Sequence, residues 1–193
     1  MRKLIMWNLV TLDGCFEGAE SWALDWHRQV LDDEFERFAL DQLRSADGLV
    51  FGRVTYEGMA AYWRTAEGEV ARFMNALPKV VVSRTLEMAD WENARLVRGD
   101  AASAVRELKE QGDGNLFVFG SASLSATLIR GGLFDEYRLL VVPVVLGEGR
   151  HLFEGGPPRR RFRLLRSRAF ASGGVLLCYA PEQGARPPAR SVG

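Results

Sequence analysis

Hydrophobic and polar positions follow two different periods in turn along most of the chain. Runs rich in Val, Ile, Leu and Phe predict buried strands at 3–10, 49–51, 79–83, 94–97 and 115–119. Between these runs apolar residues recur every three or four positions, as at Phe35, Phe38, Ala39 and Leu43, which is typical of an amphipathic helix. This spacing predicts helices over 32–44, 54–62, 70–77, 101–111 and 123–130.

After residue 137 the chain has the pattern of strands alone, at 138–145, 162–171 and 175–180. Ser172-Gly173-Gly174 between the last two is a hairpin turn signal. Strands that alternate with helices and end in a hairpin predict an α/β fold with a mostly parallel central sheet and a C-terminal antiparallel hairpin. We expect one domain over residues 1–181 and a flexible tail over 182–193, which is rich in Pro, Gly and Arg.

Composition narrows the possible function classes. The 193 residues are 47% hydrophobic and include 25 basic and 25 acidic side chains, so the near-zero net charge argues against a general nucleic-acid binder. No apolar run approaches the roughly 18 residues that a membrane-spanning helix needs. The apolar start of the chain ends by Thr11, with Asp13 close behind, which favours a strand over a signal peptide. We therefore expect a cytoplasmic protein without membrane contact.

Cysteine and histidine usage argues against a structural metal. Cys15 and Cys178 lie far apart without a CxxC motif, which favours free thiols over a disulfide framework. His27 and His151 lack the spacing of metal ligands, so no metal site is expected.

The segment 51–57, Phe-Gly-Arg-Val-Thr-Tyr-Glu, follows a predicted strand and begins a predicted helix. Gly52 allows a sharp turn, after which the first backbone N–H groups of the helix are free, with Arg53 beside them. Free N–H groups at the positive end of a helix attract anions, so a phosphate or pyrophosphate is the expected occupant. Taken alone, such a turn is also an ordinary α/β connection.

Four motifs in this order resemble those of one family. They are Thr-Leu-Asp-Gly at 11–14, Gly-Arg-x-Thr-Tyr-Glu at 52–57, Val-Phe-Gly-Ser-Ala at 118–122, and 133–139 leading into Val-Pro-Val-Val-Leu-Gly-Glu-Gly at 142–149. Over roughly residues 1–180 the chain resembles the dihydrofolate reductase-like family. Within that family it is most similar to the reductase domain of bacterial riboflavin biosynthesis (RibD C-terminal domain-like) and its stand-alone relatives. The resemblance implies a three-layer, dihydrofolate reductase-like sandwich.

The resemblance also implies NADPH as cofactor. Its pyrophosphate and adenosine side would contact two turns, at Gly52, Arg53 and Thr55 and at Gly120, Ser121, Ala122, Ser123 and Leu124. Ser121 stands where the family usually has a second glycine. Ser83 and Arg84 would contact the adenosine 2′-phosphate, which suits a guanidinium, although many Ser-Arg pairs merely begin turns. Gly14, in a mobile loop over 11–22, would contact the nicotinamide.

On the substrate side, the family has one acid on the first helix that binds the substrate ring and assists protonation. Glu34 lies nearest to this position and Asp33 is second, although the helix dipole alone favours acids in a first turn. Trp22, together with Trp26 and His27, either lines the binding site of a planar substrate or belongs to the ordinary packing of the protein. By resemblance, Pro143 and Gly147 would shape the substrate pocket.

These features favour an NADPH-dependent reductase that transfers a hydride to a C=N or C=O group of a small heterocyclic or sugar-derived substrate. The activity would be similar to that of 5-amino-6-(5-phosphoribosylamino)uracil reductase, without the zinc deaminase domain of the bifunctional riboflavin enzyme. Two alternatives stay open, a non-catalytic nucleotide- or ligand-binding protein on the same fold and a true dihydrofolate reductase. The long apolar strands at 138–145 and 162–171 predict a homodimer.

Overall fold

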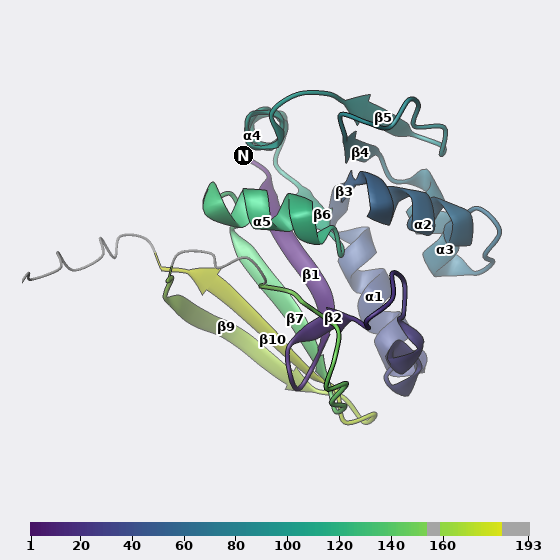
Figure 1. Ribbon diagram of the computed structural model, residues 1–193, viewed down its shortest axis with the longest axis vertical. Coiled ribbons are helices and arrows are strands. Elements are labelled where there is room, and N and C mark those ends of the chain that lie inside the picture. Colours follow the sequence, from purple (N-terminus) through teal and green to yellow (C-terminus); the bar gives the residue numbers. More distant parts are fainter. Residues whose placement is uncertain (154–158, 183–193) are drawn as a thin grey trace, which may run out of the picture.

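Eight strands build one sheet through the middle of the molecule. In this computed structural model, which describes residues 1–153 and 159–182, they are β1 (Lys3–Thr11), β3 (Ala46–Gly52), β4 (Lys79–Val82), β5 (Ala94–Val97), β6 (Asn115–Val118), β7 (Glu136–Val142), β9 (Phe162–Ala169) and β10 (Val175–Pro181). Their order across the sheet is β5-β4-β3-β6-β1-β7-β10-β9 (Figure 1). The six strands from β5 to β7 run parallel, whereas β10 is antiparallel to both β7 and β9.

Helices cover both faces of this sheet. They are α1 (Asp33–Arg44), α2 (Arg53–Trp63), α3 (Glu69–Ala76), α4 (Ala101–Glu110), α5 (Ala122–Arg130) and the short 3-10 helix η1 (Asp25–Gln29). The first three α-helices contribute Phe38, Tyr56 and Met74 to a core on one face. On the other face α4 and α5 contribute Val105 and Leu128 to a second core. The expected three-layer α/β sandwich with a mostly parallel sheet and a C-terminal hairpin is therefore confirmed.

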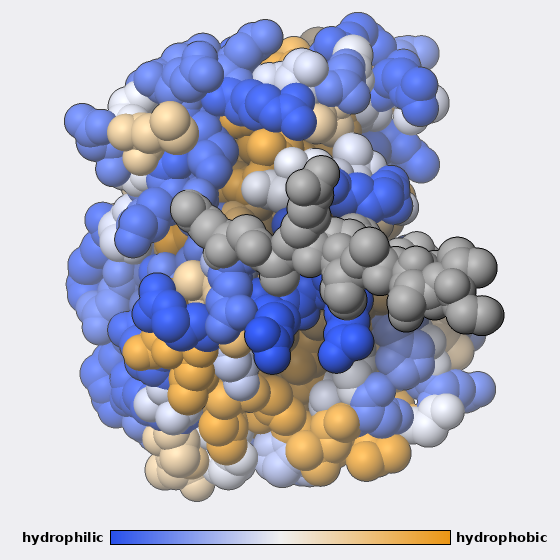
Figure 2. Space-filling view, turned by 90° about the vertical axis from the view of Figure 1, so that its left-hand side faces the viewer, coloured by the Kyte–Doolittle hydropathy of each residue, from blue (hydrophilic) through white to orange (hydrophobic). Residues whose placement is uncertain are grey.

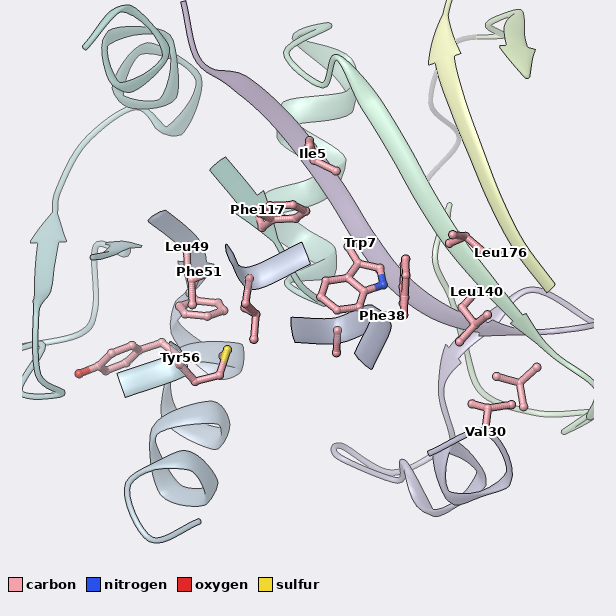
Figure 3. Close-up of a cluster of buried hydrophobic side chains, with 14 of the residues drawn as sticks. Ile5, Trp7, Val30, Phe38, Leu49, Phe51, Tyr56, Phe117, Leu140 and Leu176 are labelled. Carbon is pink, nitrogen blue, oxygen red and sulfur yellow. The ribbon is translucent and has the colours of Figure 1, made fainter. Parts of the chain in front are cut away.

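The alternation of side chains along β1 connects the two cores. Ile5 and Trp7 belong to the core under α1, α2 and α3, whereas Leu4 and Met6 belong to the core under α4 and α5. Successive side chains of a strand point to opposite faces, so a strand that is apolar throughout is buried on both. Figure 3 shows the first core, in which the Trp7 ring lies edge-on to Phe38 with their centroids 5.6 Å apart.

Most predicted elements are confirmed to within two residues at each end. β3 begins at Ala46, three residues before its predicted start, because Ala46 and Gly48 already pair with β6. The strand predicted over 138–145 occupies Glu136–Val142 instead. It ends there because Pro143 has no N–H group with which to continue the ladder.

Three short elements were not predicted. β2 (Cys15–Glu17) and β8 (Arg150–His151) pair antiparallel in a small second sheet, and η1 precedes α1. Segments of two to five residues contain too few positions to display a hydrophobic period. The predicted tail over 182–193 lies outside the described residues except for Glu182, and β10 ends at Pro181.

Parallel pairing places the carboxyl ends of β1, β3, β4, β6 and β7 at one edge of the sheet. At this edge the chain enters α2 behind β3 and α5 behind β6. The same edge carries the loop that follows Thr11 and the turn that begins at Ser83. Ligands of open α/β sheets bind at this edge, and most of the predicted site residues lie there.

Candidate functional site

Two helices begin side by side at the carboxyl edge. α2 and α5 follow β3 and β6, which are neighbouring parallel strands. Gly52 is the N-cap residue of α2 and Ser121 that of α5, and no side chain caps either helix. The turns touch, because a Cβ built on Gly52 would lie 3.6 Å from Leu124 Cβ. The N–H groups of residues 53–55 and 122–124 therefore present two positive helix ends at the same edge.

Side-chain oxygens bind three other backbone N–H groups in these turns. The Gly52 N–H donates to Ser121 Oγ over 3.1 Å, and the Ser121 N–H donates to Thr55 Oγ1 over 2.9 Å. The Gly120 N–H donates to Asn8 Oδ1 over 2.5 Å. The structure thus brings the predicted residues Gly52, Thr55, Gly120 and Ser121 together, with Ala122, Ser123 and Leu124 in the first turn of α5.

Asn8 also lies at this edge, and no motif pointed to it. Its side chain is buried at 6% exposure, and its Oδ1 must face the Gly120 N–H because only oxygen can accept that bond. The remaining amide nitrogen, Nδ2, has no hydrogen-bond partner among the described residues. An unpaired buried donor costs about 1–3 kcal/mol, so its position marks a place for an acceptor atom. A single polar residue within the apolar run 4–10 is the signal that could have revealed it.

The Ser83-Arg84 turn lies one strand further along the edge, since Gly52 pairs with Val82. The Ser83 hydroxyl accepts hydrogen bonds from two N–H groups of its own turn, at 3.2 and 3.0 Å. Arg84 is exposed, and Arg98 lies against the same turn, with Nη1 3.3 Å from the Arg84 carbonyl oxygen. The turn therefore presents two guanidinium groups, of which Arg98 was not predicted.

Arg53 is turned along its own helix. Its Nη1 lies 2.9 Å from Glu57 Oε2, four residues later, and both side chains are about half exposed. Surface pairs of this spacing contribute only about 0.3–0.5 kcal/mol, so the guanidinium is free to exchange Glu57 for another anion.

Asp13 connects the turn after β1 to the segment after β7. Its carboxylate accepts hydrogen bonds from Thr11 Oγ1 at 2.5 Å and from the Gly147 N–H at 2.9 Å. These bonds, that from Thr11 above all, lower the pKa of Asp13 to about 2. Gly14 follows with φ of +84°, in the left-handed region that its lack of a side chain permits. Pro143 and Gly147 are both exposed on this segment.

Trp22 covers part of α2. The residue has a φ of +67°, and its N–H donates to Glu17 Oε1 over 2.6 Å. The buried Glu17 carboxylate also pairs with Arg150 over 2.9 Å. A Cβ built on Gly58 would lie 1.9 Å from Trp22 Cζ2, so the indole lies directly on the backbone of α2. The end of the loop that was expected as a lid therefore lies against this helix, and its role as a lid stays a prediction.

Glu34 connects α1 to the hairpin of β9 and β10. Its carboxylate accepts hydrogen bonds from Arg168 Nη2 at 2.6 Å and from the Ala171 N–H at 2.9 Å. The bond from Ala171 and then that from Arg168 lower the pKa of Glu34, so the group is ionised at neutral pH. Asp33 is exposed in the same first turn of α1. This arrangement suits Glu34 to accept a hydrogen bond from a ligand, and its catalytic role stays a prediction.

Trp26 and His27 pack on each other, with ring centroids 4.3 Å apart. Trp26 belongs to the core under α1, α2 and α3, so it packs there, whereas Trp22 lies apart on Gly58. Trp26 Nε1 and His27 Nε2 have no hydrogen-bond partner within the described part of the chain. Burial lowers the pKa of His27 to about 4.

Residues 1–153 and 159–182 contain neither a cluster of metal ligands nor a membrane-spanning helix. No three side chains of His, Cys, Asp or Glu gather there as metal ligands would. None of the helices described has the length and apolar character required to cross a bilayer.

Sequence comparisons place the chain beside known proteins. A family model described as the RibD C-terminal domain matches residues 2–176. Among curated proteins, the uncharacterized protein YyaP of Bacillus subtilis (strain 168) is 32% identical over 183 residues, which cover 92% of this chain and 94% of YyaP.

Solved structures share the fold. A Shewanella sp. PV-4 protein assigned to riboflavin biosynthesis has a TM-score of 0.76 and 22% identity, over 94% of this chain and 99% of that one. A Thermotoga maritima diaminohydroxyphosphoribosylaminopyrimidine deaminase/5-amino-6-(5-phosphoribosylamino)uracil reductase has a TM-score of 0.65 and 16% identity, over 94% of this chain and 57% of that one. Dihydrofolate reductase from Enterococcus faecalis, complexed with NADP(H), has a TM-score of 0.60 and 12% identity, over 93% and 96%. These matches confirm the dihydrofolate reductase-like fold.

Proposed function

Because the chain belongs to the RibD C-terminal domain family, we propose that it is an NADPH-dependent reductase. Its reaction is the transfer of a hydride to a C=N or C=O group of a small heterocyclic or sugar-derived substrate. The observation that carries the proposal is the meeting of two uncapped helix N-termini at the carboxyl edge of a parallel sheet. The Thermotoga and Enterococcus reductases, which share the fold, support it.

The residues at this edge fit a phosphorylated dinucleotide. The N–H groups of 53–55 and 122–124 would hold its pyrophosphate, and the unpartnered Asn8 amide would donate to a further acceptor. Arg84 and Arg98, one strand away, would hold the 2′-phosphate. Gly14, in its left-handed turn, would let the backbone approach the nicotinamide closely. The chemistry supplied by bound NADPH is the donation of a hydride.

Other residues of the chain would orient the substrate and exclude water. Trp22 closes the loop over α2, and Pro143 and Gly147 lie on the segment that Asp13 holds against β1. A closed loop of this kind shields a hydride transfer from solvent. Glu34 would accept a hydrogen bond from a substrate N–H, with Asp33 as the second acid.

A second candidate function is ligand binding without turnover. It is favoured by the state of Glu34, the best placed acid, which pairs with Arg168 and holds no proton to donate at neutral pH. Fold similarity does not distinguish this candidate from the reductase, since function depends on the site. The alternative of a true dihydrofolate reductase is supported by the fold alone, because the Enterococcus enzyme is only 12% identical to this chain.

The first test is a fluorescence titration with NADPH and NADH. We expect micromolar binding of NADPH and binding of NADH that is weaker by about tenfold or more, because only NADPH has a 2′-phosphate for Arg84. Arg84→Ala should weaken NADPH much more than NADH. Arg72→Ala, at an exposed arginine on α3, should change neither. Equal loss of both nucleotides in Arg84→Ala would overturn the 2′-phosphate role.

Oxidation of NADPH then separates the candidate functions. The panel contains the aminouracil substrate of the Thermotoga reductase, other C=N and C=O compounds, and dihydrofolate. Turnover of a compound supports the reductase and identifies its substrate class. Tight NADPH binding without turnover of any compound in the panel supports the ligand-binding candidate. Turnover of dihydrofolate that antifolates inhibit supports a true dihydrofolate reductase.

Of the two strands expected to form a dimer contact, β7 lies inside the sheet between β1 and β10, so that part of the expectation is wrong. We further propose that two copies of the chain pair through β9. This strand ends the strand order, and all eight of its residues are exposed. Leu164 is 50% exposed and Leu165 41%. Figure 2 faces this side and shows apolar side chains gathered in its lower half. An edge strand with exposed apolar side chains is a template for association, and symmetric dimers cover such edges.

A further inference from the structure

Thr55 and Ser121 bind the two turns of the site to each other. The Gly52 N–H donates to Ser121 Oγ, and in the opposite direction the Ser121 N–H donates to Thr55 Oγ1. The pair therefore contributes one hydrogen bond in each direction between the start of α2 and the start of α5. Thr55 is 9% exposed and Ser121 7%, so water does not replace these bonds readily.

The conformation of Ser121 shows what its hydroxyl contributes. Its φ of 53° and ψ of 49° place it in the left-handed region, which is unfavourable for a residue with a side chain. Such strain persists where the surroundings impose it. A glycine would adopt this conformation freely, but it has no oxygen to accept the Gly52 N–H. The serine thus retains a bond between the turns that glycine cannot make.

The same bonds decide which donors remain for a ligand. The N–H groups of Gly52, Gly120 and Ser121 already donate to protein acceptors. The hydroxyl oxygens of Thr55 and Ser121 each already accept one of these bonds. A ligand anion at these turns has the N–H groups of 53–55 and 122–124 at its disposal. Their usefulness to a single anion depends on the spacing between the two helices.

We propose that Thr55 and Ser121 are positioning residues, which form a clasp that holds the N-termini of α2 and α5 at the spacing that a pyrophosphate requires. The inference rests on the proposed function, and it changes the predicted role of both residues from cofactor contact to support of the backbone. The Asn8 side chain adds a third anchor, because it fixes Gly120 to β1. The clasp acts on the pyrophosphate and leaves the 2′-phosphate turn at Ser83 unaffected.

The test compares two ligands that use different parts of the edge. Inorganic pyrophosphate probes the two helix ends, and adenosine 2′-monophosphate probes the Arg84 turn. Their dissociation constants, with that of NADPH, are measured for the wild type, Thr55→Val, Ser121→Ala and Ser121→Gly. Thr55→Ser retains the acceptor and serves as the conservative variant. Thr127→Val is the control, because both partners of Thr127 Oγ1 belong to α5 itself: it donates to the Ser123 carbonyl oxygen and accepts from Arg130 Nη2.

We expect Thr55→Val and both Ser121 variants to bind pyrophosphate and NADPH about tenfold more weakly. A loss of this size corresponds to the net contribution of one hydrogen bond. Binding of adenosine 2′-monophosphate should stay within about twofold of the wild type. Thr55→Ser and Thr127→Val should bind all three ligands as the wild type does. In the free protein, the Gly52 amide proton should exchange faster in Ser121→Ala, and the Ser121 amide proton faster in Thr55→Val.

Several results would overturn the clasp. Unchanged pyrophosphate affinity in Thr55→Val and Ser121→Ala would do so. An equal loss of affinity for pyrophosphate and for adenosine 2′-monophosphate would also do so, because it indicates that the substitution disturbs the whole edge of the sheet. Wild-type affinity in Ser121→Gly would show that the backbone conformation, and not the hydroxyl, sets the spacing. A wild type that binds neither NADPH nor pyrophosphate would refute the proposed function and the clasp together. If the wild type binds NADPH and the variants bind pyrophosphate and NADPH with unchanged affinity, the clasp alone is refuted.

Discussion

At the scale of the residue, His27 lies in η1 with its ring edge-on to Trp26, and its Nε2 has no partner among the described residues. Burial lowers its pKa from 6.5 to about 4. Between these two pH values the unfolded chain binds a proton that the folded protein does not. The free energy of unfolding should therefore fall as the pH falls through this window, by up to about 1.4 kcal/mol per pH unit.

Urea unfolding of the wild type and of His27→Gln at pH 7 and pH 5 measures this contribution. We expect the wild type to lose about 1–2 kcal/mol more than His27→Gln between these pH values, because only the wild type can protonate this ring on unfolding. His151→Gln is the matched control, since the chain has two histidines and His151 is exposed. An identical pH dependence in His27→Gln and the wild type would show that the ring is not held neutral.

At the scale of the element, the loop between β2 and η1 is fastened at two points. The Glu17 carboxylate receives the Trp22 N–H and pairs with Arg150, and the Trp22 indole lies on Gly58. No other residue type fits at position 58 with the indole in place, because a Cβ there would lie 1.9 Å from the ring. The position of this loop against α2 therefore depends on a glycine in that helix.

Gly58→Ala should release Trp22 while leaving α2 intact. Alanine is favoured over glycine in a helix interior by about 1 kcal/mol, and this gain offsets part of the free energy lost with the indole contact. We expect the tryptophan emission to shift to longer wavelength, because the indole loses the backbone that covers it, and proteolysis within residues 18–24 to become faster. In a Trp22→Phe background the emission shift of Gly58→Ala should disappear. An unchanged emission spectrum in Gly58→Ala would contradict the contact.

Glu34 shows a similar connection between elements. Its carboxylate joins the start of α1 to Arg168 on β9 and to Ala171 in the following turn. The hairpin is therefore connected to the helix that carries the predicted acid. The sequence located this acid on the first helix, but its partners lie more than 130 residues later and no local pattern identified them.

At the scale of the whole molecule, β9 is the element through which a second copy would bind. Leu164→Arg should place a charge in the middle of the proposed contact, beside Arg163 and Arg166, where like charges from two chains would meet. We expect light scattering at micromolar concentration to give twice the chain mass of 21.6 kDa for the wild type and the single chain mass for the variant.

Tyr62→Arg is the control for this prediction, because Tyr62 is a more exposed apolar side chain on α2, at 63%. It should leave the mass of the wild type unchanged. A monomeric wild type would refute the dimer itself. A dimeric Leu164→Arg variant would place the contact elsewhere on the molecule.

The site itself was predictable only in part. The glycine turns at Gly52 and Gly120 were identified because a strand, a glycine and a helix follow one another locally. The hydrogen bonds that join Thr55 and Ser121 to the facing turns, the bond from Gly120 to Asn8 and the contact of Arg98 with the Arg84 turn were not. Each depends on a contact between elements, and the residues involved are individually ordinary for their positions.

The order of strands and helices was determined by the sequence itself, because a period of two or of 3.6 residues records which side of each element is buried. The mostly parallel sheet followed, since helices that separate strands provide the crossovers that parallel pairing requires. Only the tertiary structure decided that Gly120 meets Asn8, 112 residues away, and that Gly52 meets Ser121, 69 residues away. Such hydrogen bonds depend on which strands are neighbours and in what register, and a periodicity within one element contains neither.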